Sequence, residues 1–267
     1  MKYSILDPTG NITALAEDFA PPAEQPAIAA AIMRRHPEVE QVGFLRAPED
    51  PGAAAELRMA GGEFCGNACL CAAALLSLGA APGEERRVTL RVSGAAAPVE
   101  TRLKRESGGG FSGAVRMPPA LEIAEHSFAF GALRGRLPLV RMEGISHAVI
   151  EPDKVFFALL EDRAAAGDAA RALCRELGAD CLGLLFLERD ASGYRLTPLV
   201  WVPGSGTLFW ESSCASGTAA VAMLLAAREG RAVRLSVAEP AGLLSAESGP
   251  EGTWLCGRVA LSGQYEL

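Results

Sequence analysis

The stretch GGEFCGNACLCAAALLSLGA, residues 61–80, sets a cysteine between a glycine-rich turn and a long apolar run. The apolar run opens at Cys65 and ends near Gly79, which predicts a buried helix that begins at this cysteine. A second stretch, ESSCASGTAAVAMLLAAREG at residues 211–230, repeats the arrangement, with Cys214 at the start of its apolar run. Two apolar helices that each begin at a cysteine are therefore the predicted framework of the fold.

The segments around these two helices also match one another. Residues 27–50 have the pattern of an amphipathic helix followed by an apolar strand, and residues 168–190 have the same pattern. An alternating, strand-like segment follows each apolar helix, as RRVTLRV at 86–92 and as RAVRLSV at 231–237. These matches predict two homologous halves, and a chance likeness between ordinary helix–strand units is the alternative.

Glycine-containing turns of a few residues join many of the predicted strands, such as SGGGFSG at 107–113 and RDASGY at 189–194. Such turns connect antiparallel neighbours, so the sheets should be largely antiparallel or mixed. The fold class is therefore predicted to be α+β, with a sheet wrapped around the apolar helix in each of two pseudo-symmetric halves. A cleft between the halves would then hold both cysteines.

The boundary between the halves is predicted at Met117-Pro118-Pro119, because two consecutive prolines interrupt strand pairing. The N-terminal half is then residues 1–118 and the C-terminal half residues 119–267, and each contains one of the two helix-starting cysteines. We expect the last strand, near residues 258–267, to pack back on the N-terminal half.

Composition and charge exclude several classes of protein. The chain has 267 residues, of which 49% are hydrophobic and 21% charged, as in an average folded domain. A net charge of −7 argues against a nucleic-acid partner. Its longest apolar runs are shorter than the roughly 20 residues of a membrane helix, and MKYSILDPTG reaches Asp7 and Pro8 before a signal-peptide apolar region could form. We therefore expect a cytoplasmic protein with no membrane or nucleic-acid partner.

Each helix-starting cysteine stands where serine, threonine or aspartate usually caps a helix. The unpaired N–H groups of the first turn and the helix dipole make this position electropositive. A thiol there should ionise more readily than a free thiol, whose pKa is about 8.5, and the same N–H groups can hold a carboxylate. We expect both thiols to be easily ionised for this reason.

If the halves face each other, Cys65 and Cys214 approach one bound carbon from opposite sides, which suits the inversion of a stereocentre. One cysteine, as thiolate, would remove the α-proton of an amino acid, and the other, as thiol, would deliver a proton to the opposite face. The scheme needs no cofactor, and the sequence contains no Rossmann or Walker glycine pattern. We predict an amino-acid substrate, no cofactor, and a homodimer as a candidate assembly.

The other cysteines suggest no further site. Seven is an odd number, which argues against a disulfide framework in a cytosolic chain. Cys69 lies one helical turn beyond Cys65 and Cys71 lies on another face, so the three do not converge as zinc ligands must, and we predict no metal. A thiol redox sensor, with a regulatory disulfide between Cys65 and Cys214, and a non-catalytic ligand-binding protein are the alternatives to an enzyme.

Four stretches of the chain resemble the diaminopimelate epimerase and proline racemase superfamily of cofactor-independent amino-acid racemases. They are PTGNITALAED at 8–18, EFCGNACLC at 63–71, GISHAVI at 144–150 and SSCASGTAA at 212–220. The resemblance implies a diaminopimelate epimerase-like α+β fold and an isomerase, a racemase or epimerase that works without pyridoxal phosphate.

The resemblance also implies a set of site residues. Cys65 and Cys214 match the two catalytic cysteines of the superfamily. Positions that match substrate-binding elements, or lie among them, are Asn11, Gln41, Gly66, Asn67, His147, Ser216, Gly217 and Thr218. The only two asparagines of the chain are in this set, which favours a functional role for both. For His147, a buried histidine satisfied by the backbone is the alternative.

The chain departs from diaminopimelate epimerases before the second cysteine. Their Glu-Arg-Gly element and the arginine that grips the distal carboxylate have no counterpart in WVPGSGTLFWESSC, residues 201–214. Losing a charge-assisted clamp weakens binding of meso-diaminopimelate. We instead expect Glu211, with Trp210 beside it, to face a neutral or cationic side chain, although a carboxylate that only complements the helix dipole is the alternative for Glu211.

The segments MAGGEFCGNA and WESSCASGT are similar in sequence to segments of the histidine racemases that supply D-histidine for opine metallophores. This similarity implies that the chain converts L-histidine to D-histidine. Diaminopimelate epimerase, or another amino-acid racemase or epimerase of the same fold, is the alternative.

Overall fold

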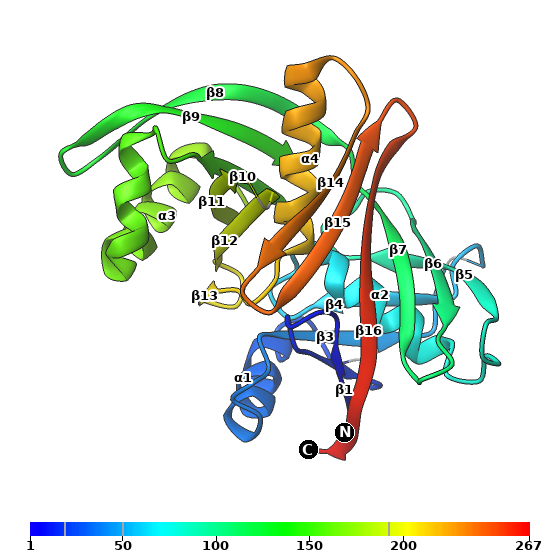
Figure 1. Ribbon diagram of the computed structural model, residues 1–267. Helices are drawn as coiled ribbons and strands as arrows, with labels where there is room; N and C mark the ends of the chain where they lie inside the picture. The colour runs from blue at the N-terminus through cyan, green and yellow to red at the C-terminus, as the bar shows by residue number, and fades with distance from the viewer. Residues whose placement is uncertain (19, 50, 192) are drawn as a thin grey trace.

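The computed structural model describes residues 1–18, 20–49, 51–191 and 193–267 (Figure 1). The described residues before the proline pair form seven strands and two helices. In chain order these are β1 (Lys2–Asp7), β2 (Thr13–Ala16), α1 (Gln25–Arg35), β3 (Gln41–Arg46), β4 (Ala55–Met59), α2 (Gly66–Leu76), β5 (Glu85–Val92), β6 (Val99–Arg105) and β7 (Phe111–Met117).

The second part of the chain begins at Ala120, directly after Pro118 and Pro119. Its elements are β8 (Ala120–Phe130), β9 (Leu133–Met142), β10 (Ile145–Ile150), the 3-10 helix η1 (Val155–Glu161), α3 (Arg163–Leu177), β11 (Leu182–Asp190), β12 (Gly193–Val202), β13 (Thr207–Trp210), α4 (Ala215–Glu229), β14 (Val233–Glu239), β15 (Gly242–Gly249) and β16 (Gly252–Glu266). As predicted, one helix follows Cys65 and another follows Cys214.

The strand pairing is mixed, in agreement with the sequence. Before the proline pair, β2 pairs with β3 and β4 pairs with β5 in parallel, and the other pairs are antiparallel. After it, β10 pairs with β11 and β12 pairs with β14 in parallel. Each parallel pair is separated in the sequence by a helix, because a parallel connection must cross over the sheet.

We expected each half to have its own sheet, but the strands are not divided into two separate sheets. All described strands except β13 form one continuous path, β1-β2-β3-β4-β5-β6-β7-β16-β15-β14-β12-β11-β10-β9-β8, and β13 pairs with β12 beside it. The long strand β16 makes the connection, because it pairs with β15 and β7 and then, from Ala260 to Glu266, with β1. Both chain ends therefore lie side by side (Figure 1).

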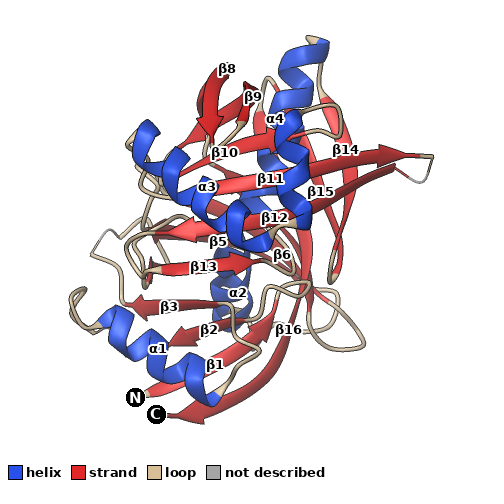
Figure 2. Ribbon diagram, turned by 90° about the vertical axis from the view of Figure 1, so that its left-hand side faces the viewer, coloured by secondary structure: helices blue, strands red, loops and turns tan. Residues whose placement is uncertain are grey.

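The helices α2 and α4 lie in the main core, whereas α1 and α3 lie on outer faces of the sheet (Figure 2). Every residue of α2 from Gly66 to Ala74 is buried, which suits its run of alanines and cysteines, since small side chains let strands approach from all sides. The core around α2 and α4 is continuous across both parts of the chain. Among the described residues, no helix combines the length and apolarity needed to cross a bilayer.

Candidate active site

The two helix-starting cysteines line the same cavity. Cys65 and Cys214 both have extended backbones, with φ −134° and −128°, as residues at N-cap positions do. The cavity measures about 20 Å³, room for about one water molecule. Its lining residues are Asn11, Gln41, Glu63, Phe64, Cys65, Gly66, Asn67, Ile145, Val200, Val202, Glu211, Cys214, Ala215 and Ser216.

The first turns of the two helices touch each other. A Cβ placed on Gly66 would lie 3.0 Å from the Cβ of Ala215, so glycine at this position allows the close approach. The Nδ2 of Asn67 donates to the carbonyl oxygen of Ser213 at 3.3 Å. The start of α2 is therefore held directly against the segment that leads into α4.

Residues from the N-terminal part of the chain also hold the segment before Cys214. Gln41 Nε2 donates to Glu211 Oε1 at 2.9 Å. Glu40 accepts a hydrogen bond from Asn11 Nδ2 at 2.9 Å, and it also accepts the backbone N–H of Ser212 at 3.1 Å and the Ser212 hydroxyl. Asn11 and Gln41 thus lie at the cavity as the resemblance implied, although in this state both amides bind glutamates of the protein.

The backbone of Gly10 brings the loop of Asn11 to this segment. Gly10 has a φ of +98°, and a Cβ on it would lie 1.9 Å from the Cβ of Ala241, in the turn between β14 and β15. Only glycine combines this conformation with so close a contact. The backbone N–H of Ala241 in turn donates to the carbonyl of Ser212, so the loop, the turn and the segment before Cys214 pack together.

Glu63 is a buried carboxyl of the cavity that is not among the site residues expected from the sequence. Its side chain is 7% exposed, and its Oε2 has no hydrogen-bond partner among the described residues. Burial raises its pKa from 4.5 to about 7, against the lowering effect of the backbone N–H groups of Glu63 and Gly61 and of the Arg58 charge. Its place two residues before Cys65 was the available signal.

Glu211 is also buried at the cavity, as predicted, but its carboxyl is already engaged. Burial raises its pKa to about 8, the charges of Glu40 and Glu63 add to this, and hydrogen bonds with Cys214 and Gln41 act in the opposite direction. The two carboxyls therefore differ in one respect that matters for binding. Glu211 faces protein donors, whereas Glu63 has a free oxygen.

The expectation of easily ionised thiols is wrong for this closed state. Burial raises the pKa of the Cys65 thiol well above its ordinary value, although the backbone N–H of Ala68, 3.4 Å from its sulfur, has the opposite effect. Burial likewise raises the pKa of the Cys214 thiol, and the Glu211 carboxylate adds to it. Loss of solvation therefore outweighs the helix-start effect on which the prediction depended.

His147 lies behind the cavity and not in its wall. Its ring on β10 is fully buried, and its Nε2 is 3.0 Å from the Ser216 hydroxyl, whose oxygen is 3.6 Å from Cys214 Sγ. Burial lowers the pKa of His147 to about 3, so the ring is neutral. The predicted histidine thus reaches the cysteine through Ser216.

Two other predicted positions also fall outside the cavity wall. Gly217 packs on Leu185, where a Cβ would lie 2.8 Å from Leu185 Cδ2. The Thr218 hydroxyl is fully buried and donates to Glu239, a residue that the sequence did not single out. Trp210, expected beside Glu211 at the cleft, instead stacks on Phe186 in the core around α3, with ring centroids 5.7 Å apart.

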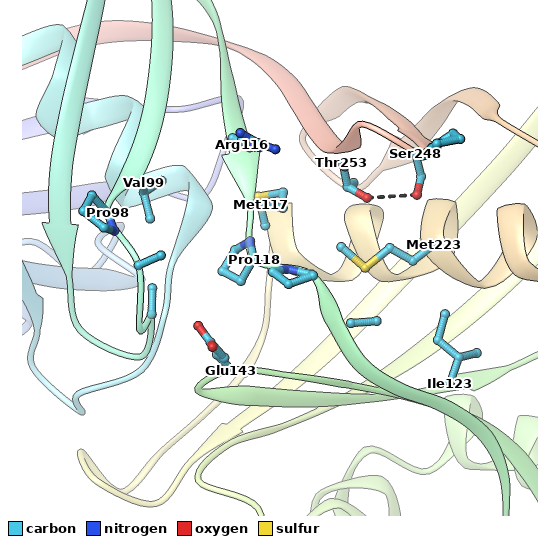
Figure 3. Close-up of a pocket in the computed structure, with 17 residues that line it drawn as sticks. Pro98, Val99, Arg116, Met117, Pro118, Ile123, Glu143, Met223, Ser248 and Thr253 are labelled. Carbon is cyan, nitrogen blue, oxygen red and sulfur yellow. Dashed lines mark hydrogen bonds between the residues drawn. The ribbon is translucent and has the colours of Figure 1, made fainter.

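Cavity size alone does not identify the site. A cavity of about 590 Å³ lies at the connection between β7 and β8, among apolar residues such as Met117, Pro118 and Met223 (Figure 3). The described residues that line it include no predicted site residue. A surface depression of about 960 Å³ shares Glu63 and Ile145 with the cysteine cavity, so it adjoins that cavity directly.

Comparison with known proteins identifies the family of the chain. The family model described as the histidine racemase CntK N-terminal domain matches residues 1–263. A histidine racemase of Fusobacterium nucleatum subsp. nucleatum (strain ATCC 23726) is 27% identical over 228 residues, which cover 82% of this chain and 79% of that protein. A histidine racemase of Staphylococcus aureus (strain Mu50) is 26% identical over 227 residues, 83% of this chain and 78% of that protein.

Solved structures show the same fold at low sequence identity. A probable proline racemase from Agrobacterium radiobacter K84 superposes with a TM-score of 0.71 at 18% identity, covering 100% of this chain and 92% of that one. A hydroxyproline epimerase from Agrobacterium vitis gives a TM-score of 0.72 at 16% identity, covering 100% and 90%. The fold is thus proline racemase and diaminopimelate epimerase-like, as the sequence resemblance implied.

Proposed function

The chain belongs to the histidine racemase CntK N-terminal domain family and is an amino-acid racemase, an isomerase, and from this premise we propose that it interconverts L- and D-histidine at the Cys65–Cys214 cavity. One observation carries the proposal. Two cysteines, each at the start of its own helix, line one cavity together with two buried carboxyls. That arrangement supplies two proton-transfer groups and a partner for a cationic or N–H-bearing side chain.

In the proposed reaction, one cysteine acts as thiolate and removes the α-proton, so that an S–H bond forms and the C–H bond breaks. The electron pair stays on the α-carbon and is delocalised into the substrate carboxylate, which the N–H groups at the starts of α2 and α4 stabilise. The other cysteine, as thiol, then protonates the opposite face. The stereocentre is inverted, the two thiols have exchanged protonation states, and no cofactor takes part.

The cavity wall favours histidine over a substrate with a distal carboxylate. Its described lining residues include no lysine or arginine, so a second carboxylate would have no cationic partner there. The free Oε2 of Glu63 is an acceptor without a donor, and an imidazole N–H would supply that donor. We propose that Glu63 accepts this bond and that Glu211, which lines the same cavity, adds its charge.

The proposed catalytic cycle requires the cleft to open. A cavity of about 20 Å³ admits about one water and no amino acid. We propose that histidine enters through the adjoining depression at Glu63 when the two parts of the chain separate. The bonds from Gln41 to Glu211 and from Asn67 to Ser213 would then break, because each joins residues on opposite sides of the cleft.

An exchange assay tests the substrate. Each L-amino acid is incubated with the reduced protein in deuterated water, the α-proton is followed by NMR, and the product enantiomer is identified by chiral chromatography. We expect loss of the histidine α-proton and formation of D-histidine. A different amino acid that reacts at least about tenfold faster would contradict histidine as the substrate.

Matched variants test the proposed contacts to the side chain. Glu63→Gln should weaken histidine binding more than alanine binding, because alanine offers no side-chain N–H, and Glu211→Gln should show the same trend to a smaller degree. Glu24→Gln, at an exposed carboxyl with no side-chain cap bond, is the control. Equal effects on histidine and alanine would remove both carboxyls from side-chain recognition.

We also propose that residues 1–118 and 119–267 are pseudo-symmetric halves, which the matched order of parallel and antiparallel pairs supports. A cytoplasmic location, a homodimer, and D-histidine as a precursor of an opine metallophore remain proposals as well. The last is supported by the similarity of the two cysteine segments to histidine racemases. Loss of the gene should then abolish metallophore production in metal-poor medium, and added D-histidine should restore it.

A further inference from the structure

The two cysteines at the cavity differ in how their helices are capped. The sulfur of Cys65 accepts the backbone N–H of Ala68, so this thiol itself caps α2. The thiol of Cys214 makes no cap hydrogen bond to α4. Since first-turn N–H groups need acceptors, another group must serve α4 in its place.

That group is Glu239, the last residue of β14. Its Oε2 accepts the backbone N–H of Cys214 at 2.5 Å, and its Oε1 accepts the hydroxyl of Thr218. The side chain is 7% exposed. One carboxyl from a neighbouring strand thus spans the first turn of α4, where the helix dipole favours a negative charge.

The N-terminal part of the chain has no equivalent carboxyl. In the register that aligns RRVTLRV at 86–92 with RAVRLSV at 231–237, Gly94 occupies the position of Glu239. A Cβ on Gly94 would lie 2.4 Å from the backbone nitrogen of Phe64, next to Cys65. In both parts of the chain this position therefore faces the segment that contains the cysteine. It carries a side chain only in the C-terminal part, where the residue is Glu239.

We infer that Glu239 is a positioning residue for Cys214. The Glu239 carboxyl caps α4 in place of the thiol and lies beside Cys214, so that in the resting enzyme Cys214 keeps its proton and Cys65 ionises first. The inference rests on the proposed two-cysteine reaction. In that reaction one cysteine must be ionised while the other is protonated, and the inference assigns the ionised state to Cys65 and the protonated state to Cys214.

The two thiols share burial and the charge of Glu211 but differ in their other neighbours, and Glu239 acts on Cys214 alone. At Cys214, burial, the charges of Glu211 and Glu239 and a hydrogen bond with Glu211 raise the pKa of the thiol, and the Ser216 hydroxyl lowers it. At Cys65, burial and the charges of Glu211, Cys69 and Glu63 raise the pKa, and the Ala68 N–H lowers it. Burial raises the pKa of Glu239 itself to about 8, so its charge acts mainly above that pH.

Alkylation of the free protein tests the inference without any substrate. The reduced protein is treated with iodoacetamide between pH 6 and pH 10, and the modification of each cysteine is followed by peptide mass spectrometry. We expect Cys65 to react roughly tenfold faster than Cys214 in the wild-type protein, since the thiolate is the reactive form. Equal rates would overturn the inference, and this comparison holds even if a variant fails to fold.

Glu239→Gln separates the charge from the packing. Glutamine can still accept from the Cys214 N–H and can donate to the Thr218 oxygen, so the cap geometry is retained. The midpoint of the Cys214 alkylation profile should fall by about one pH unit, with the Cys65 profile unchanged. Glu247→Gln, which removes an exposed carboxylate from the neighbouring strand β15, is the matched control and should leave both profiles unchanged.

A folded Glu239→Gln protein with an unchanged Cys214 profile would overturn the inference, as would equal shifts at both cysteines. In racemisation assays we expect kcat to fall roughly tenfold with KM little changed, because the residue acts on the reacting thiol and not on the substrate. Since the alkylation measurement needs no amino acid, it stands even if histidine proves not to be the substrate.

Discussion

Replacing Glu63 by glutamine should stabilise the unliganded protein at alkaline pH. The pKa of this buried carboxyl is 4.5 in the unfolded chain and about 7 in the fold. Because the folded state holds the proton more tightly, the burial penalty is absent below pH 4.5, grows as the pH rises, and is complete above about pH 7. Glutamine has the shape of the protonated carboxyl and carries no charge at any pH.

The magnitude follows from the two pKa values. Their difference of about 2.5, at about 1.36 kcal/mol for each pKa unit, corresponds to about 3 kcal/mol at pH 8. The side chain is 7% exposed, so solvent screening reduces this little. Glu63→Gln should therefore raise the free energy of unfolding by about 3 kcal/mol at pH 8 and change it little at pH 4.5.

Urea unfolding of the wild-type and Glu63→Gln proteins at pH 4.5 and pH 8, in the absence of any amino acid, measures this difference. Other buried acids, such as Glu211 and Glu239, contribute to the pH dependence of both proteins and largely cancel in the comparison. Glu24→Gln, at an exposed position, should show no pH-dependent change. If the Glu63→Gln effect is the same at both pH values, the carboxyl is not a desolvated acid and the argument for a free acceptor in the cavity fails.

Three further predictions concern the chemistry and the fold. Cys65→Ser and Cys214→Ser should each reduce histidine racemisation by at least about 100-fold, measured by chiral chromatography, and a variant that keeps a tenth of the activity would refute the two-base reaction. Adding pyridoxal phosphate should not change the racemisation rate, and stimulation would contradict the cofactor-free scheme. Gly10→Ala should lower the free energy of unfolding in urea by about 2–4 kcal/mol, because a Cβ would lie 1.9 Å from the Cβ of Ala241. Gly83 also has a positive φ but has open space around it, so Gly83→Ala should lower this free energy by only about 1 kcal/mol. Equal losses in the two variants would show that the contact with Ala241 does not matter.

Local sequence predicted the elements of the fold well. The apolar runs after Cys65 and Cys214 are the helices α2 and α4, and the alternating segments after them are β5 and β14. Periodicity identifies such elements because it reports which faces are buried. It did not predict that β16 would join the strands of the two parts into one sheet, because that connection pairs residues as far apart as Lys2 and Glu266.

The candidate site was predicted in part. Asn11, Gln41, Asn67 and Glu211 lie at the cavity, whereas His147 lies behind Ser216 and Thr218 binds Glu239. Motif matching places a residue near a site but does not say whether its side chain faces the cavity or a neighbouring strand. Glu239 could not be found in this way, because it lies 25 residues after Cys214 on a strand whose approach to α4 depends on the packing of the sheet.

The sequence by itself determined the two helices, the cysteine at the start of each, and the membership of the chain in a racemase family, because these depend on periodicity and on residues close together in the chain. Only the tertiary structure decided the protonation chemistry. A position at the start of a helix predicts easily ionised thiols, but burial of both sulfurs beside Glu63, Glu211 and Glu239 reverses the direction of their pKa shifts. Solvation depends on everything that surrounds a group, and these surroundings come from segments of the chain that meet only when it is folded.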